Sequence, residues 1–287
     1  MLPTRKKIGF VCNDAGAANI ICSWIQTKDI NKYNFYLKGP AIQIFKHLNI
    51  KNQRNMKKVI LSSDVIVAGT GWMSDVEFNA IKIANLNKIY SIAVIDHWVN
   101  YKERFIRNRK LYYPNEFWVT DRYAYNIAKK YFPSNNIFLK KNNYLNIQLD
   151  KIKKSKSDKK TILYILEPIR KQWIKNKKSE FQSLNFFLSK LEKISLPKEF
   201  IIKLRLHPSE KKTKYNNWIK KQKINNIELD KNIDLHQSIG ESYCVVGLNS
   251  FALVIALKSY KKVYCSLPPW APLCVLPFKK IVHLRNL

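Results

Sequence analysis

The densest group of chemically capable side chains lies in residues 95–105, directly after a hydrophobic run. Most of these residues can hydrogen-bond, ionise or stack. Asp96 and His97 supply a candidate acid and base, although neighbours on an extended chain point in different directions. We expect other side chains of this stretch to contact a bound ligand, namely Trp98, Asn100, Tyr101 and Arg104. Because no second His or Cys lies at ligand spacing, no metal site is expected here.

A second polar loop follows the first hydrophobic run of the chain, at residues 12–19. Its residues are small and lack the GxGxxG spacing of a dinucleotide fingerprint. Gly16 would let a sugar or phosphate approach the start of the next helix. Asp14 is either a general base or the cap of that helix, and the sequence leaves both roles open.

A third loop, at residues 68–75, joins a predicted strand to a predicted helix and is rich in glycine. Gly71 allows close approach of a ligand to the backbone. Trp72 is either a surface on which a sugar ring stacks or a lid over the hydrophobic core. At the start of the helix, Ser74 and Glu77 have the spacing of a capping box.

The second half of the chain contains two motifs that suit an anion. Arg205, His207 and Pro208 end one predicted strand, and the proline fixes the turn that holds the imidazole. Gly247, Asn249 and Ser250 end another strand and begin a helix, whose free amides favour negative charge. Together these motifs predict a phosphate clamp. Glu167 either contacts a ribose or base or simply ends its strand.

The elements that would hold these loops follow a βαβ pattern, in which short β-branched or aromatic runs alternate with longer amphipathic stretches. Predicted strands cover residues 8–12, 34–37, 64–68, 89–95, 117–119, 161–166, 200–206, 227–229, 243–246 and 262–265. Predicted helices cover residues 18–27, 41–48, 75–86, 122–131, 179–191, 211–222, 234–239 and 251–258. Asp121 is expected to cap the helix at 122–131.

The pattern divides the chain into two α/β halves, each large enough for its own core. We predict a Rossmann-like domain at residues 1–140, a lysine-rich linker at 141–160 and a second Rossmann-like domain at 161–287. Ligands of open parallel sheets bind beyond the carboxyl ends of the strands. The working site is therefore expected in a cleft between the two halves.

The formal net charge of +32 admits two interpretations. It would suit an anionic membrane, a nucleic acid or an anionic substrate. The abundance of Lys, Asn and Ile beside few Gly is also what an AT-rich genome imposes on any protein. Because the basic residues are dispersed and no nucleic-acid module is recognisable, we do not expect a nucleic-acid partner.

The five cysteines have no CxxC spacing and indicate free thiols in a reducing compartment. The apolar stretch near the N-terminus breaks at Asn13 and Asp14, too early for a signal peptide. We expect a cytoplasmic protein that contacts the inner face of a membrane at most peripherally.

The second-half motifs resemble the His-Pro and Ser/Thr-rich motifs of GT-B-type glycosyltransferases, such as the bacterial sialyltransferases, Kdo transferases and related capsule or teichoic-acid enzymes. The residues that carry the resemblance are residues 205–208 and 247–250. The resemblance implies that His207 and the loop with Ser250 hold a nucleotide phosphate, and that no metal or cofactor is needed. The acidic tripeptide of the sialyltransferases is absent, which leaves Asp14 and Asp96 as candidate bases.

This resemblance implies transfer of a sugar, for instance a CMP-linked nonulosonate or Kdo, to a surface glycan acceptor. The first half would bind the acceptor through Gly16, Gly71, Trp72 and the 95–105 stretch. A nucleotide-sugar hydrolase or epimerase on the same fold is a second hypothesis. A third is a non-catalytic basic protein that binds nucleic acid or anionic lipid, with a concentrated basic face and salt-sensitive affinity.

Overall fold

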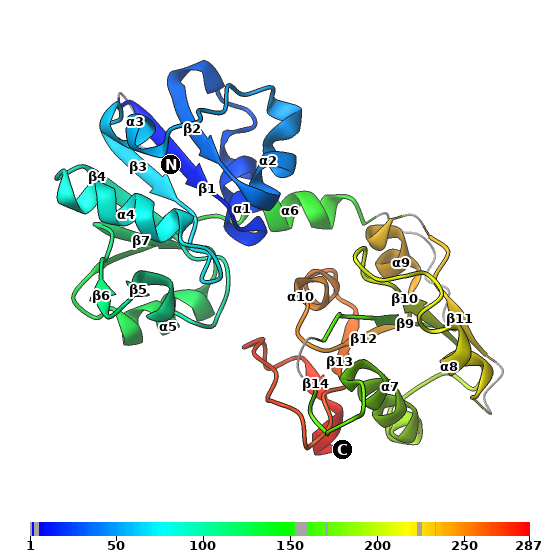
Figure 1. Ribbon diagram of the computed structural model, residues 1–287. Helices are drawn as coiled ribbons and strands as arrows, with labels where there is room; N and C mark the ends of the chain where they lie inside the picture. Colours follow the sequence, from blue (N-terminus) through cyan, green and yellow to red (C-terminus); the bar gives the residue numbers. More distant parts are fainter. Residues whose placement is uncertain (1, 3–5, 153–159, 170–171, 223–225, 233) are drawn as a thin grey trace. The chain divides into compact units, whose positions relative to one another are not determined.

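The computed structural model describes residues 2, 6–152, 160–169, 172–222, 226–232 and 234–287. The chain divides into two compact units, Met1–Tyr144 (unit 1) and Leu145–Leu287 (unit 2), each built on its own sheet (Figure 1).

The sheet of unit 1 has six parallel strands in the order β2-β1-β3-β4-β7-β8. The strands are β1 (Ile8–Cys12), β2 (Tyr33–Leu37), β3 (Val65–Ala68), β4 (Tyr90–Val94), β7 (Glu116–Val119) and β8 (Asn136–Leu139). The order of the strands reverses between β1 and β3, which makes that pair the topological switch point of the sheet. Every residue of β1 and β3 is buried, as expected of central strands covered on both faces.

Helices connect these strands, and a small hairpin projects from the loop after β4. The elements are α1 (Ala15–Ile25), η1 (Ile30–Lys32), α2 (Gly39–Phe45), η2 (Lys46–Leu48), α3 (Met56–Leu61), α4 (Val76–Leu86), η3 (Glu103–Phe105), β5 (Ile106–Arg107), β6 (Lys110–Leu111) and α5 (Arg122–Tyr131). The helix α6 (Asn143–Asp150) crosses the boundary between the two units. Apolar side chains of β1, β2 and α1 form a continuous buried core with β3 and β4. This core fixes the ends of the strands from which the polar loops emerge.

Unit 2 repeats the architecture with the strand order β11-β10-β9-β12-β13-β14, again all parallel. Its strands are β9 (Thr161–Ile165), β10 (Ile201–Arg205), β11 (Ile227–Leu229), β12 (Cys244–Gly247), β13 (Lys262–Cys265) and β14 (Val282–His283). The helical elements are α7 (Ser179–Ser189), η4 (Leu191–Lys193), α8 (Asn216–Lys220), α9 (Leu235–Glu241), α10 (Phe251–Lys258) and η5 (Leu284–Asn286). The switch point of this sheet lies between β9 and β12.

The predicted fold class of two parallel-sheet α/β domains is confirmed, with several local corrections. The strands β8 and β14 and the helix α3 were not predicted. Residues 143–150 form α6 inside the stretch predicted as a linker, and the rest of that stretch lies partly outside the described residues. The helix predicted at 211–222 shrinks to the five residues of α8. Within the described part of the chain, no helix is long and apolar enough to cross a bilayer.

The two predicted helix caps have opposite outcomes. The Asp121 carboxylate accepts a hydrogen bond from the Ala124 amide at 2.8 Å, so the predicted cap of α5 is confirmed. The capping box at Ser74 and Glu77 is wrong. The cap residue of α4 is Asp75, and the Glu77 side chain turns into the core instead of back toward Ser74.

Candidate functional site

Three loops of unit 1 meet at the carboxyl edge of the sheet, beside its switch point. They follow the neighbouring strands β1, β3 and β4. A Cβ placed on Gly16 would lie 1.8 Å from Asp96 Oδ2, and one on Gly71 would lie 3.1 Å from Asp14 Cβ. Only glycine therefore allows the loops to approach this closely, and the approach brings the two candidate bases into one cluster.

Glu77 anchors this cluster, although the sequence analysis assigned it only to a helix cap. Its buried carboxylate accepts hydrogen bonds from the amides of Asn13 and Asp14 at 2.6 and 2.9 Å. The second oxygen, Oε2, is buried without a hydrogen-bond partner among the described residues. Burial raises the pKa of Glu77 against the lowering effect of the two amides. Glu77 thus fixes the loop that carries Asp14.

Asp14 fills one of the two roles that the sequence left open, the cap of α1, and its environment bears on the other. Its Oδ1 accepts a hydrogen bond from the Gly16 amide at 3.0 Å, which caps α1. Burial, followed by the negative charge of Asp96, raises the pKa of the Asp14 carboxyl. A carboxylate with a raised pKa is a better proton acceptor than an exposed one, because proton transfer works best when the pKa of the base approaches the working pH. Capping therefore holds the group in place without removing its basicity.

Arg104 is buried and ties two of the loops together. Its Nη1 lies 2.8 Å from Asp96 Oδ1 and donates to the carbonyl and hydroxyl oxygens of Thr70 at 2.6 and 2.9 Å. The Nε group donates to the Val99 carbonyl at 3.3 Å. Arg104 was predicted to contact an acceptor, but these bonds direct its guanidinium into the protein, where it holds Asp96.

His97 lies next to these charges and is largely enclosed. Burial lowers the pKa of its imidazole, an effect that Asp96 and Asp14 partly offset. Its Nδ1 is buried and has no hydrogen-bond partner among the described residues. At neutral pH the imidazole is therefore neutral.

The aromatic residues of the 95–105 stretch differ from the prediction. Trp98 and Tyr101 are 7% and 2% exposed, and they hydrogen-bond to Asp121 Oδ2 and the Ala124 carbonyl at 3.0 and 3.2 Å. These bonds fasten the loop to α5, and the burial of both rings counts against the predicted contact with an acceptor. Asn100 has a φ of 59°, a left-handed conformation that Asn tolerates in turns. Trp72 remains half-exposed and accessible.

In unit 2, the predicted phosphate clamp is already filled by a carboxylate of the same chain. Glu167 Oε1 accepts hydrogen bonds from the amides of Leu248, Asn249 and Ser250 at 3.1, 2.9 and 2.9 Å. Burial raises the pKa of Glu167, while the three amides act in the opposite direction. The amides before α10 do bind an acidic group, as predicted, but that group is the Glu167 side chain. This corrects the prediction that these amides are free for a phosphate.

The remaining donor candidates of unit 2 separate into buried and exposed groups. Ser250 caps α10, and Asn249 Oδ1 accepts from the Val275 amide at 2.9 Å. Arg205 is held by Asp230 at 2.9 Å and has a structural role. His207 and the adjacent Pro208 are exposed beyond β10, and His207 Nδ1 lies 2.7 Å from the Ser209 hydroxyl. Of these candidates, His207 is the ionisable group that is free to reach a ligand.

Unit 1 also has a cavity of about 990 Å³ that the sequence analysis missed. It contains none of the polar residues at the carboxyl edge of β1, β3 and β4. Its lining includes aromatic side chains and several lysines, namely Trp24, Tyr33, Trp118, Lys6, Lys7, Lys28, Lys32, Lys140 and Lys141. These lysines are dispersed in sequence, which is why no charge run indicated the cavity.

Comparison with solved structures identifies the class of fold. The structure resembles a Staphylococcus aureus MnaA–UDP complex, with a TM-score of 0.59 and 13% identity over 91% of this chain and 78% of that chain. It also resembles a Neisseria meningitidis UDP-GlcNAc 2-epimerase bound to UDP-GlcNAc, with a TM-score of 0.58 and 12% identity over 90% and 81% of the respective chains. Acinetobacter baumannii MurG matches with a TM-score of 0.54 and 11% identity over 94% and 79%.

These similarities establish that the chain has a GT-B-type fold, which confirms the predicted fold class. No protein-family model matches the sequence. No curated protein matches it either. At this level of identity, the likeness concerns the fold, and the chemistry must be argued from the residues.

Proposed function

We propose that this chain is an enzyme that acts on a nucleotide sugar, and that it transfers the sugar to the hydroxyl group of a glycan acceptor. The observation that carries the proposal is the cluster of Asp14, Asp96 and His97 at the switch point of unit 1, where a buried arginine holds one carboxylate. The fold supports it, because solved structures of this fold include enzymes described with UDP and UDP-GlcNAc.

Asp14 is the general base in this proposal. Its raised pKa and its fixed position suit removal of a proton from an acceptor hydroxyl. The Asp96 carboxylate is already engaged by Arg104 and serves to position the cluster and to raise the pKa of Asp14. In this proposal His97, whose pKa both carboxylates influence, accepts a hydrogen bond from the substrate or relays the proton.

Unit 2 binds the nucleotide in this proposal. His207 donates a hydrogen bond to a phosphate oxygen, while Glu167 orders the loop at residues 248–250. The first nucleotides to test are uridine nucleotides, given the ligands named for the similar structures, with CMP as the alternative from the motif resemblance. Glu167 already accepts the three amides at the start of α10, so a phosphate bound there must be held by other groups.

The nucleotide is tested by thermal shift with UDP, CMP and GDP, because a ligand that binds only the folded state raises the melting temperature. His207→Ala is expected to lower the affinity for the stabilising nucleotide with no change in the melting temperature of the free protein. The matched control is His47→Ala, which removes an exposed histidine of unit 1. Unchanged affinity in the His207 variant would rule out its role as a phosphate donor.

The base is tested by Asp14→Asn, which keeps an oxygen to cap α1 and removes the charge. We expect kcat to fall by about 100-fold or more, the usual contribution of a general base. In the wild type, activity should fall as the pH drops through the raised pKa of Asp14, because only the ionised carboxylate accepts a proton. Asp29→Asn is the control, since Asp29 caps η1 in the same way but is exposed. Full activity of the Asp14 variant would exclude this residue as the base.

A second reaction, epimerisation or hydrolysis of the nucleotide sugar, is favoured by the Neisseria meningitidis UDP-GlcNAc 2-epimerase structure of the same fold. Its residue-level support is that burial moves the pKa of Asp14 upward and that of His97 downward, so the cluster contains two groups suited to proton transfer. Incubation with the sugar nucleotide alone separates the reactions. A changed sugar without acceptor supports epimerisation or hydrolysis, and an absolute need for acceptor supports transfer.

A further inference from the structure

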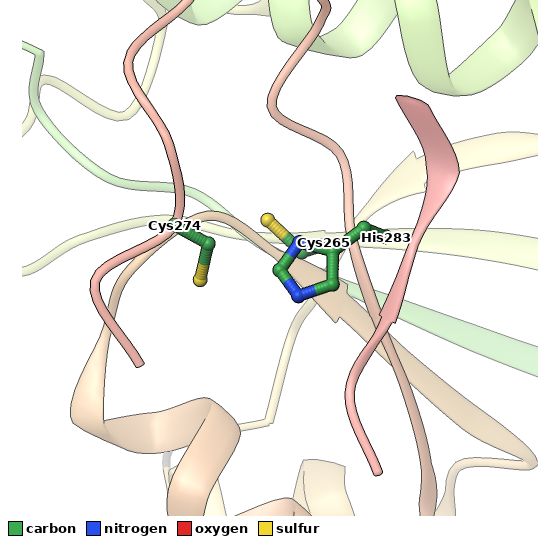
Figure 2. A group of neighbouring side chains, drawn as sticks. All are labelled: Cys265, Cys274 and His283. Carbon is green, nitrogen blue, oxygen red and sulfur yellow. The ribbon is translucent and has the colours of Figure 1, made fainter. Parts of the chain in front are cut away.

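Two cysteines and a histidine from separate parts of unit 2 converge at the carboxyl edge of its sheet. Cys265 ends β13 and His283 ends β14, and these two residues are direct partners in the parallel pair. Cys274 comes from the intervening loop. The sulfur atoms and a ring nitrogen all lie within 4.8 Å of one another. Figure 2 shows the three side chains grouped around one space, although eight residues separate each of them from the next in the sequence.

The loop that carries Cys274 is held in place by Arg285. The guanidinium donates to the carbonyl oxygens of Leu267, Pro268 and Ala271, which lie between the two cysteines. Both thiols also point toward the Leu248 carbonyl, at 3.4 Å from Cys265 and 3.5 Å from Cys274. The cluster is therefore ordered by contacts outside itself, as in a preformed ligand site.

Two thiols and an imidazole are the kinds of group that bind a soft metal ion, and the ion displaces the thiol protons when it binds. A hydrogen bond between the thiols lowers the pKa of Cys274 and raises that of Cys265. Burial, together with the positive charge of Arg285, lowers the pKa of His283, so its imidazole is neutral at physiological pH. Thiolate and neutral imidazole are the ligands that Zn²⁺ prefers.

The distances are close to those of a zinc centre. With Zn–S bonds of about 2.3 Å and Zn–N bonds of about 2.0 Å, ligand atoms of a tetrahedral site lie roughly 3.5–3.8 Å apart. Because the ligand atoms all lie within 4.8 Å of one another, a contraction of at most about 1 Å at the longest pair closes the site. Three protein ligands leave the fourth position open to water.

We propose that Cys265, Cys274 and His283 bind one Zn²⁺ ion per chain. Each thiol loses its proton to solvent as its sulfur bonds to the metal, and a water molecule fills the fourth position. The ion links β13, the loop after it and β14, next to the Leu248 carbonyl and the loop that binds Glu167. The sequence analysis expected no metal, because the three ligands come together only through the pairing of β13 with β14. The proposal is independent of the reaction that the protein catalyses.

The test uses the full chain, purified without metal and kept reduced. Co²⁺ serves as the spectroscopic stand-in for Zn²⁺. We expect thiolate-to-cobalt charge-transfer absorption in the near ultraviolet and the visible bands of a tetrahedral centre, both saturating at one ion per chain. Zn²⁺ should displace the cobalt, release protons and raise the melting temperature of the wild type. Mg²⁺, which prefers oxygen ligands, should produce none of these three effects.

The variants Cys274→Ser and His283→Gln each remove one ligand. Both should lower the Zn²⁺ affinity by at least about 100-fold, beyond the 10–100-fold typical for loss of an outer partner of a metal site. The matched controls are Cys22→Ala and His47→Gln, which remove a cysteine and a histidine of unit 1 and should bind like the wild type. Circular dichroism of the metal-free variants checks that each is folded.

Three results would overturn the proposal. One is a wild-type chain without thiolate-to-cobalt absorption. Another is equal absorption in the wild type and Cys274→Ser, which would assign the metal to other thiols. The third is a Zn²⁺-induced rise in melting temperature that survives in both ligand variants.

Discussion

At the scale of single residues, Glu77 of unit 1 is buried and holds the loop that carries Asp14. Its Oε1 binds two amides of the loop that carries Asp14, whereas Oε2 is buried without a partner among the described residues. Burial raises the pKa of this carboxyl, so the folded state holds a proton more tightly than the unfolded chain does. The free energy of unfolding should therefore fall as the pH rises above the ordinary pKa of a glutamate.

Two substitutions separate the charge of Glu77 from its hydrogen bonds. Glu77→Gln keeps an oxygen for both amides and removes the charge, so we expect nearly unchanged stability at neutral pH and a weaker pH dependence. Glu77→Ala leaves two buried amides unpaired and should cost about 2–5 kcal/mol. Urea unfolding of both variants across the pH range measures the difference. Equal destabilisation by the two substitutions would contradict the role assigned to the hydrogen bonds that the Glu77 oxygen accepts.

Sequence reasoning identified the loops of the site better than the roles of their residues. Asp14, Asp96 and His97 were found because parallel strands place their following loops at one edge of the sheet. Glu77 was misassigned because its spacing from Ser74 fits a local capping box, whereas its partners lie in the loop after β1. Local patterns cannot show which distant amide a buried carboxylate will meet.

At the scale of elements, α10 shows how a helix start can attract an anion from its own chain. The three amides before the helix converge on Glu167, which follows β9 on the other side of the switch point. This arrangement joins two neighbouring strands through charge-assisted hydrogen bonds, which are stronger than neutral ones. It also makes the loop rigid where the nucleotide is proposed to bind.

Removing this carboxylate should expose the helix start. Glu167→Ala is expected to destabilise unit 2 by about 1–3 kcal/mol, because the buried amides lose their acceptor. Inorganic phosphate should then raise the melting temperature of the variant more than that of the wild type, since it can occupy the vacated position. Glu199→Ala, which removes an exposed glutamate of the same unit, is the control. An identical phosphate response in the variant and the wild type would argue against an anion site at α10.

The elements themselves were largely predictable, and the failures have a common cause. Strands such as β1 and β9 are continuous apolar runs because both of their faces are covered, and such runs are visible in sequence. In contrast, β14 has only two residues and β8 is an edge strand with three of its four residues exposed. Their pairing depends on the sheet they join. The helix α6 was missed because it lies in a lysine- and asparagine-rich stretch with weak apolar periodicity.

For the whole molecule, charge is the dominant feature. The chain has 52 basic and 20 acidic side chains, so most basic groups have no carboxylate to pair with. Part of this excess gathers around the aromatic cavity of unit 1, where six lysines come together from distant parts of the sequence. This local concentration of lysines makes contact with an anionic surface a testable alternative to a purely compositional origin of the charge.

We therefore expect the chain to bind vesicles that contain phosphatidylglycerol and not vesicles of phosphatidylcholine alone. Binding should weaken steeply with added salt, because exposed charges are screened within about 10 Å at 0.1 M ionic strength. The double variant Lys28→Glu/Lys141→Glu should lower the partition coefficient at least about tenfold, since each basic residue near an anionic membrane contributes about 1 kcal/mol. Vesicle cosedimentation measures these effects.

The matched control for the vesicle experiment is Lys211→Glu/Lys212→Glu, which changes the net charge equally at two exposed lysines of unit 2. If the cavity lysines form the contact, this control should retain most of the binding. If both double variants lose binding to the same extent, the interaction follows the net charge of the chain. In that case the basic cavity would have no special part in it, and genome composition would be the better explanation of the excess charge.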